Sequence, residues 1–430
     1  MYKTIFLGTI VRSGGSLLAR LFDGHPEILS YPVEVGFPFA NGFYPIFESY
    51  VGVPSKIPDL DGIPDADVYS LMGIPKAKPK VALKWGKEHA DPVGARKNYL
   101  EKVYYDTVKT DFDFDRFIQL FDEYRKGART VAGLYDARHR AYFEAWDKGR
   151  HIGEPKFVLL HDSGGLYLAD VARLFKEFEG SVFILPIRDV MGYIASEKTR
   201  LARRYYGARR FSYPPFPNFL VRAFTEYDLD AHIRGWMVAF TRAVLFQEKY
   251  GVNGRFIAYG HSNLINDTEG TMRALLRSVG ARYDGVVLEP TIGGHMWTGN
   301  SHQGKRKGVS KDLESYYPKV LSAEETDKIR EKAGALIDFL KCSRETPLDL
   351  TKIPKKHLPD YEYQRKYFDD EEKAALYYAL MNTGCRRAMV RVPPAYSVLA
   401  FLYSKMVQLI HMPRMLKMKY FPGLGKQNYT

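Results

Sequence analysis

The sequence predicts an α/β protein, a three-layer sandwich whose central, mostly parallel sheet is flanked by helices. Three observations lead to this fold class. Short apolar, β-branched runs alternate with stretches of helical spacing, as in strands joined by crossover helices. A glycine turn joins the first of these strands to the first helix. The 430 residues are 45% hydrophobic and 26% charged, a composition that suits one large or two ordinary globular domains.

The predicted elements follow in order from the start of the chain. Lys3 to Val11 is an apolar run that predicts a strand. It leads through the glycine turn into Ser16 to Phe22, whose apolar residues have helical spacing. Right-handed crossovers then predict parallel pairing for the elements that follow. These are a strand from 156 to 160, a helix from 166 to 178, strands from 181 to 187 and from 255 to 259, and a helix from 268 to 279.

Two regions stand apart from this alternation. Residues 40–155 contain loops rich in Pro, Gly and Asp and an aromatic helical stretch from 114 to 124. We interpret this region as an insertion over the sheet, of the kind that shapes a substrate pocket. The sequence therefore predicts an α/β domain over 1–345 and a basic, helical C-terminal extension over 346–430.

Composition and charge exclude several classes of protein. Two cysteines, Cys342 and Cys385, are too few for a disulfide framework, and no Cys/His cluster has the spacing of a zinc site. No signal peptide is recognisable, so we expect a reducing, cytoplasmic location. The net charge of +13 indicates an anionic partner, either a nucleotide, a polyanion, nucleic acid or a membrane surface. Nine Lys or Arg and no acidic residue lie in 373–430, which holds 9 of these 13 charges.

The glycine turn predicts an anion site. Backbone N–H groups in such a turn, between a strand and a helix, converge on one point. The Walker pattern of nucleotide-binding loops is absent, because Gly15 stands where its lysine belongs and Thr9 where its first glycine belongs. Arg12 is the only cation of the loop. The alternative is a turn with Ser13 or Ser16 as N-cap and no ligand.

The stretch TIVRSGGSLLARLFDGHPE, from Thr9 to Glu27, resembles the 5′-phosphosulfate loop of sulfotransferases, especially carbohydrate sulfotransferases. In these enzymes R-S-G-[ST]-[ST] precedes a helix that ends in H-P. The resemblance implies a P-loop-like fold, 3′-phosphoadenosine 5′-phosphosulfate (PAPS) as donor, and no metal. It implies that the cation at the loop is Arg12. The implied donor-binding residues of this motif are Arg12, Ser13, Gly14, Gly15, Ser16 and Leu17.

A second stretch, FILPIRDVMGYIAS, resembles the 3′-phosphate site of the same family. Arg188 ends a predicted strand, and Ser196 lies in the next helix. At this spacing a guanidinium and a hydroxyl can converge on one phosphate. The alternative is an ion pair of Arg188 with Asp189 or Asp162 and a solvated Ser196.

A third stretch, HMWTGNSHQGKRKGVSK, resembles the basic loop that closes over the nucleotide in sulfotransferases. Arg306, Lys307 and Gly308 match the family's R-K-G, which contacts the 3′-phosphate. Upstream, YGHSNL lies where the family has Y-E-D-L. This sequence departs from that pattern, because Gly260 and His261 replace the acidic pair.

Transfer of a sulfuryl group requires a base for the acceptor hydroxyl and stabilisation of the leaving oxygen. The loop amides and Arg12 would stabilise the oxygen. Glu34, just after the first crossover helix, is the predicted base, since carbohydrate sulfotransferases have a glutamate in nearly the same place; the alternative is a surface glutamate. His25 is the second candidate, although its H-P context indicates a structural residue. The role of His161 stays open.

The C-terminal segment from 397 to 412 is apolar but short for a transmembrane helix and is interrupted by Lys405 and Gln408. With the basic residues that follow, it could lie on the inner face of an anionic membrane. The alternative is a helix packed on the core or on a second subunit.

These observations lead to one principal prediction and two alternatives. The principal prediction is a PAPS-dependent sulfotransferase that acts on a hydroxyl, in a carbohydrate or glycolipid, with PAPS and the desulfated nucleotide as partners and no nucleic acid. The first alternative, a P-loop kinase or NTPase, is disfavoured by the missing lysine. The second is a non-catalytic protein that binds polyanions or membranes through its basic tail.

Overall fold

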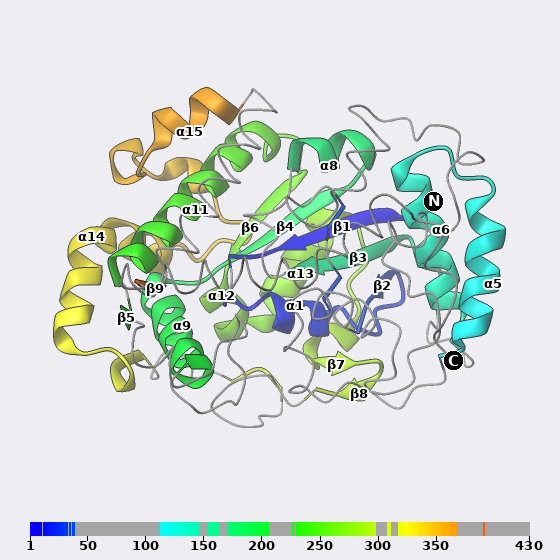
Figure 1. Cartoon of the computed structure of the whole chain (residues 1–430), viewed down its shortest axis with the longest axis horizontal. Coiled ribbons are helices and arrows are strands. Elements are labelled where there is room, and N and C mark those ends of the chain that lie inside the picture. The colour runs from blue at the N-terminus through cyan, green and yellow to red at the C-terminus, as the bar shows by residue number, and fades with distance from the viewer. Residues whose placement is uncertain are drawn as a thin grey trace, which may run out of the picture.

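The computed structural model describes residues 1–10, 12–32, 34–35, 37–38, 112–146, 153–162, 171–205, 226–227, 229–297, 308–310, 317–368 and 390–391. Its centre is a five-stranded sheet in the order β2-β3-β1-β4-β6, with every pair of neighbours parallel (Figure 1). The strands of this sheet are β1 (Lys3–Gly8), β2 (Ile28–Ser30), β3 (Phe157–Asp162), β4 (Val182–Ile187) and β6 (Phe256–Gly260).

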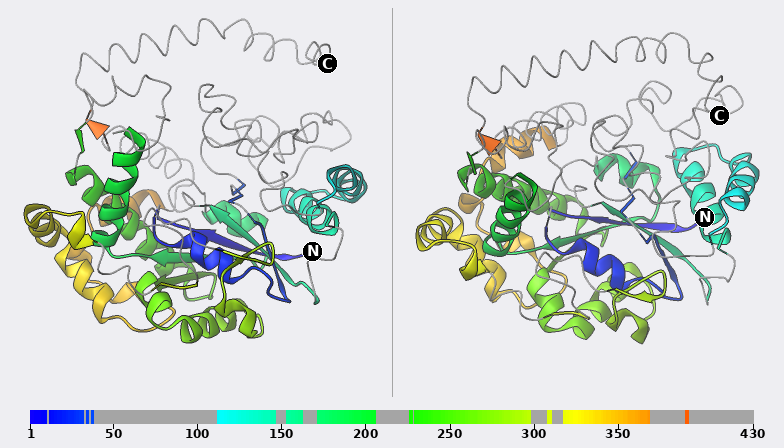
Figure 2. Two further views of the ribbon diagram at one scale, coloured as in Figure 1. Left: turned by 90° about the horizontal axis from the view of Figure 1, so that it is seen from below. Right: turned by 60° about the horizontal axis from the view of Figure 1, so that its bottom comes forward.

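Side chains of β1 alternate between the two faces of the sheet, and each face has its own core. Ile5 and Leu7 pack into one cluster and Phe6 into the other, and all three are fully buried. Figure 2 shows the layer of helices on each side of the sheet. The three-layer α/β sandwich predicted from the sequence is therefore confirmed.

One face is covered by the helices nearest the glycine turn, and its core contains Leu18, Leu264 and Met272. Asp267 accepts a hydrogen bond from Gly270 N at 2.9 Å and so caps the last of these helices, which ends at Gly280 with a left-handed φ of 82°. The helices are α1 (Gly15–Leu21), α12 (His261–Asn266) and α13 (Thr268–Val279), followed by a 3-10 turn (Gly285–Leu288).

The opposite face carries the larger core, in which Phe6 meets the rings of Phe37 and Phe178 edge to face at 5.2 and 5.3 Å. The predicted helix 114–124 is present as α5. The helices of this layer are α5 (Phe114–Arg125), α6 (Val131–Glu144), α8 (Val171–Glu177), α9 (Val190–Tyr205), α11 (Leu229–Tyr250), α14 (Ala323–Cys342) and α15 (Tyr361–Phe368).

Short elements complete the described part of the chain. Two small antiparallel pairs join β5 (Glu226–Tyr227) to β9 (Val390–Arg391) and β7 (Thr291–Ile292) to β8 (His295–Met296). Three 3-10 turns cover Tyr317–Lys319, Leu350–Lys352 and Lys355–His357.

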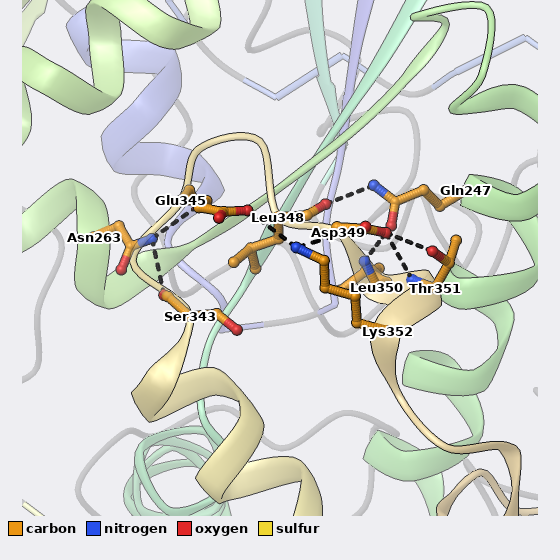
Figure 3. A network of polar contacts seen from close by, with 9 residues as sticks. All are labelled: Gln247, Asn263, Ser343, Glu345, Leu348, Asp349, Leu350, Thr351 and Lys352. Carbon is orange, nitrogen blue, oxygen red and sulfur yellow. Dashed lines mark hydrogen bonds and ion pairs between the residues drawn. The ribbon is translucent and has the colours of Figure 1, made fainter.

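The segment from 343 to 352 runs along β6, the strand at one edge of the sheet. Leu348 N donates to Ala258 O in β6 at 2.7 Å. Gln247 of α11 donates to Leu348 O at 2.6 Å and accepts from Leu350 N, as Figure 3 shows. These bonds occupy part of the row of unpaired backbone groups that an edge strand presents. Residues 343–352 thus belong to the same packed unit as the sheet.

Candidate functional site

The carboxyl ends of four adjacent strands, β3, β1, β4 and β6, lie side by side. We call this end of the strands the carboxyl edge of the sheet, and the opposite end the amino edge. The parallel register pairs Leu7 with His161 and Ile187 with Gly260. The residues that follow these positions therefore emerge side by side. They are the glycine turn after β1, Arg188 after β4 and His261 after β6. In open α/β sheets this edge is where ligands bind.

The glycine turn has two residues in left-handed conformations. Arg12 has φ 70° and Gly14 has φ 92°, and Ser13 N closes a turn onto Ile10 O at 3.0 Å. The first hydrogen bonds of α1 run from Leu17 N and Leu18 N to Gly14 O. Within the described residues, the backbone N–H groups of Gly14, Gly15 and Ser16 have no acceptor. These N–H groups can therefore donate hydrogen bonds to a bound anion.

Close contacts require glycine at both positions of the turn, and at Gly14 the left-handed φ of 92° requires it as well. A Cβ on Gly14 would lie 2.2 Å from His261 Cδ2, and one on Gly15 would lie 2.2 Å from Thr9 Cγ2 and 2.7 Å from His161 Nε2. Two imidazoles therefore flank the turn, one from β3 and one from the start of α12. No larger residue fits at either position without moving these neighbours.

Arg12 joins the two segments that the sequence assigned to separate phosphate sites. Arg12 Nε donates to Ser196 Oγ at 3.1 Å and lies 3.7 Å from Glu197 Oε1. Arg188 Nη1 donates to Arg12 O at 3.4 Å. The side chain of Glu197 is 2% exposed and that of Arg12 is 25% exposed, so Arg12 is the part of the pair that reaches solvent.

The start of α9 leaves room for the Arg188 side chain. Asp189 accepts from Gly192 N at 2.9 Å and caps the helix. A Cβ on Gly192 would lie 2.6 Å from Arg188 Nε. Trp236 Nε1 donates to Arg188 O at 3.2 Å and fixes the backbone at this point. Half-buried Arg188 is thus held over the first turn of α9, beside Arg12.

Two buried polar atoms at this edge have no hydrogen-bond partner within the described part of the chain. They are Ser13 Oγ and His161 Nε2, on residues that are 1% and 3% exposed. A buried polar atom without a partner costs about 1–3 kcal/mol, and other buried atoms of the described residues, Tyr259 Oη and His139 Nε2 among them, are in the same condition. Ser13 Oγ and His161 Nε2 lie at the glycine turn, where a bound anion would supply acceptors.

The two imidazoles at the turn are held neutral. Burial, helped by the charge of Arg20, lowers the pKa of His161 to about 3. Burial, helped by the charge of Arg188, lowers the pKa of His261 to about 3. At neutral pH both rings are uncharged, and each can donate one hydrogen bond and accept another.

Glu34 lies next to the end of β3. The neighbouring Val35 N donates to His161 O at 2.9 Å, which brings this segment to the same edge as the glycine turn, with one strand between. Glu34 itself is half-buried. Its position agrees with the predicted role of a base that faces the site, and that role stays a prediction.

His25 lies beyond the opposite end of α1 from the glycine turn. Its Nε2 pairs with Arg282 O at 2.9 Å, and its Nδ1 accepts from Glu27 N at 3.1 Å. Because Nδ1 accepts, Nε2 carries the proton and donates. The residue is completely buried, and burial lowers its pKa. With both nitrogens bonded to backbone groups, His25 has no nitrogen left to accept a proton from a substrate.

The structure describes some of the other residues that were predicted to bind the donor. Ser16 and Leu17 are half-buried in the first turn of α1, and Leu17 packs against the core of that face. Gly308 is exposed and has φ 69°. Arg306 and Lys307 lie outside the described residues, as does the C-terminal segment 397–412.

Sequence reasoning missed Glu197 and assigned no role to His261, because the contacts of both join distant segments.

Neither a metal site nor a transmembrane helix is found in the described residues. No three His, Cys, Asp or Glu side chains gather there in a way that could hold a metal ion. Of the helices described, none has an apolar stretch long enough to cross a bilayer.

Comparisons with protein families and with curated proteins find no match. Among solved structures, the chain is similar to the sulfotransferase domain of the Synechococcus PCC 7002 olefin synthase, at 14% identity and a TM-score of 0.38, over 77% of this chain and 94% of that one. It is also similar to the sulfotransferase domain of the curacin biosynthetic pathway, at 12% identity and a TM-score of 0.42, over 78% and 98%.

A third similar structure is a sulfotransferase of Mycobacterium tuberculosis H37Rv, at 15% identity and a TM-score of 0.30, over 67% of this chain and 70% of that one. All three are sulfotransferases, the family that the sequence motifs resemble. TM-scores this low carry no argument about function, which has to come from the residues at the sheet edge.

Proposed function

We propose that the chain is a sulfotransferase that takes a sulfuryl group from PAPS and transfers it to a hydroxyl group of an acceptor. The observation that carries the proposal is the contact between Arg12 Nε and Ser196 Oγ, 184 residues apart, with Arg188 bonded to Arg12 O. Two guanidinium groups and a hydroxyl around a glycine turn with unused N–H groups are the chemistry that binds a nucleotide with several anionic groups.

The residues at the turn fit such a donor. Within the described residues, Ser13 Oγ is a buried hydroxyl without a partner, and the N–H groups of Gly14 and Gly15 have no backbone acceptor. Arg12 and these groups would hold the 5′-phosphosulfate. Arg188 and Ser196 would hold the 3′-phosphate, together with the segment of Arg306, Lys307 and Gly308 on the strength of the motif.

The chemistry asks for positioning and charge stabilisation more than for covalent work. The donor supplies a sulfuryl group on a good leaving phosphate. Glu34 takes the proton of the acceptor hydroxyl, whose oxygen forms a bond to sulfur as the bond from sulfur to the bridging phosphate oxygen breaks in line. Arg12 and the loop amides stabilise the negative charge that stays on the 5′-phosphate.

The acceptor is proposed by class only. The first motif is closest to carbohydrate sulfotransferases, so we propose a hydroxyl on a sugar or glycolipid. Residues 40–155 are proposed to shape its pocket, and 40–111 and 147–152 of them lie outside the described residues. Incubation with labelled PAPS and a panel of glycans, glycolipids and small alcohols identifies the acceptor by the transferred label.

The donor is tested first by calorimetric titration of the full chain with adenosine 3′,5′-bisphosphate and, separately, with ATP. We expect tighter binding of the bisphosphate, because its 3′-phosphate adds contacts with Arg188 and Ser196. Tighter binding of ATP would instead support the kinase or NTPase alternative. Arg12→Ala is expected to abolish sulfuryl transfer to any acceptor found, and retained turnover in that variant would overturn the proposal.

A further inference from the structure

His261 lies at the edge where the proposed donor site is, although no motif assigned it a role. It is the first residue after β6, and the register between β4 and β6 places it beside Arg188. The residue is 7% exposed. A polar side chain is thus buried beside Arg188, at the carboxyl ends of the strands.

The imidazole of His261 packs directly on the glycine turn. The position that a Cβ of Gly14 would take lies 2.2 Å from His261 Cδ2 and 2.7 Å from His261 Nε2. Nε2 is therefore the ring nitrogen that reaches the turn. Within the described residues, no group donates to or accepts from either ring nitrogen of His261.

The charge of the site favours a neutral donor at this position. Arg12 and Arg188 already bring two positive charges close together, and Glu197 is a carboxylate that contacts Arg12. A third cation, such as the lysine of a Walker loop, would repel both arginines in a mostly buried place. A neutral imidazole offers a directed hydrogen bond without that repulsion, and burial beside Arg188 keeps this ring uncharged at neutral pH.

The helix that carries His261, α12, is held in place by hydrogen bonds to the segment from 343 to 352. Asn263 Nδ2 donates to Ser343 O at 3.3 Å and to Glu345 O at 3.2 Å, as Figure 3 shows. The same segment is bonded to β6 through Leu348 and to α11 through Gln247. The ring is therefore held against the turn before any ligand arrives, which lowers the ordering cost of binding.

Resting on the proposed function, we propose that His261 is a further ligand of the donor: its Nε2–H donates a hydrogen bond to an oxygen of the anion held on the glycine turn. His261 thereby supplies, as a neutral donor, a contact with the anion in place of the absent loop lysine. The chemical class it recognises is a phosphate or sulfate oxygen that approaches Gly14.

The direct test is nuclear magnetic resonance of the full chain with ¹⁵N-labelled histidine, titrated with inorganic sulfate and with adenosine 3′,5′-bisphosphate. His261→Gln assigns the His261 signals by their loss. We expect both probes to shift the His261 Nε2 signal and to leave the His25 signals unchanged, because both nitrogens of His25 are bonded to backbone groups. An unmoved His261 signal under saturating bisphosphate would overturn the inference.

The failure of this inference can be told apart from the failure of the proposed function. If calorimetry shows no bisphosphate binding, the proposed function fails, and a sulfate-induced shift of the His261 signal still supports the contact with an anion. If the bisphosphate binds and the His261 signal stays in place, the proposed function stands and the inference fails.

Substitutions give a second, independent measurement. His261→Leu removes the donor and should raise the Kd for the bisphosphate about tenfold to a hundredfold. His261→Gln keeps an amide donor and should recover most of that affinity, which a merely structural role for the ring would not produce. His357→Gln, at a histidine outside the site, is the control. Wild-type affinity in His261→Leu, or equal losses in both His261 variants, would contradict the proposal.

Discussion

The two edges of the central sheet contain the same kinds of side chain and use them differently. Each has arginines, a histidine and a glutamate whose side chain is 2% exposed, Glu27 at the amino edge and Glu197 at the carboxyl edge. At the amino edge, Glu27 accepts from Lys156 Nζ at 2.7 Å and from Arg282 N and Nε at 2.9 and 2.8 Å. Lys156 and Arg282 thus both donate to this buried carboxylate.

At the carboxyl edge the hydrogen bonding is incomplete. Ser13 Oγ and His161 Nε2 are buried without partners in the described residues, and the N–H groups of Gly14 and Gly15 have no backbone acceptor there. Arg255, before β6, bonds to three backbone carbonyls, whereas Arg188, after β4, bonds to Arg12 O and reaches toward the turn. The polar network of the amino edge thus supports the fold, whereas the donors left open at the carboxyl edge are available to a ligand.

The largest expected effect is on turnover at the carboxyl edge. Glu34→Gln should lower the rate of sulfuryl transfer about 10²-fold to 10⁴-fold, the usual contribution of a general base, while the Kd for adenosine 3′,5′-bisphosphate stays the same. Transfer of label from PAPS measures the rate. Glu179→Gln, at an exposed glutamate between α8 and β4, is the control. Unchanged turnover in Glu34→Gln would mean that another residue is the base.

The next prediction compares two glycines with a left-handed φ, one at the site and one away from it. Gly14 and Gly280 have φ of 92° and 82°, but a Cβ would clash with His261 at the first and meet nothing within 4 Å at the second. Gly280→Ala should cost about 1 kcal/mol of stability and leave binding intact. Gly14→Ala should cost about 3 kcal/mol and weaken bisphosphate binding about 100-fold.

Urea denaturation and calorimetric titration of the two glycine variants give both quantities. Equal stability losses with intact binding in both would show that His261 does not press on the turn.

Two arginines test the contrast between the edges directly. Arg188→Met should weaken bisphosphate binding about tenfold to a hundredfold and cost less stability than Arg255→Met, because its hydrogen bond to Arg12 O is long, at 3.4 Å, and its guanidinium lies beside the turn. Arg255→Met should lower stability by about 2–4 kcal/mol and leave binding unchanged, because it removes several hydrogen bonds and a contact of the guanidinium with the Phe175 ring at 4.2 Å. The reverse pattern would refute the distinction between a structural and a binding edge.

The smallest effect is a pH dependence at the amino edge. Hydrogen bonds from Lys156 and Arg282 lower the pKa of Glu27 from its ordinary 4.5 to about 2. A lowered pKa in the folded state means that the stabilisation is complete above pH 4.5 and is lost as pH falls toward 2. Its size is about 2 kcal/mol once the solvent exposure of both partners is considered.

Urea denaturation of the wild type and of Glu27→Gln at pH 7 and at pH 3 measures this effect. The difference in the free energy of unfolding between the two proteins should shrink at pH 3. A difference that does not change with pH would show that Glu27 is not the group that titrates.

Much of the fold could be predicted because its signals are local. The buried strands 157–162, 182–187 and 256–260 are apolar runs, and the helix predicted from 268 to 279 is observed over those residues, since Asp267 and Gly280 punctuate it. The predicted first strand extends to Val11, but β1 ends at Gly8, because apolar Ile10 is buried in the loop after the strand. Periodicity does not distinguish a buried loop residue from a strand residue.

The sequence by itself determined the order of strands and helices, the glycine turn without a lysine, and the motifs around Arg12, Arg188 and Ser196. These are properties of neighbouring residues. Only the tertiary structure decided that Arg12 bonds to Ser196, that His261 lies on Gly14, and that both nitrogens of His25 are already used. The physical reason is that parallel strands bring residues far apart in the chain to one edge, and no local pattern records which of them meet.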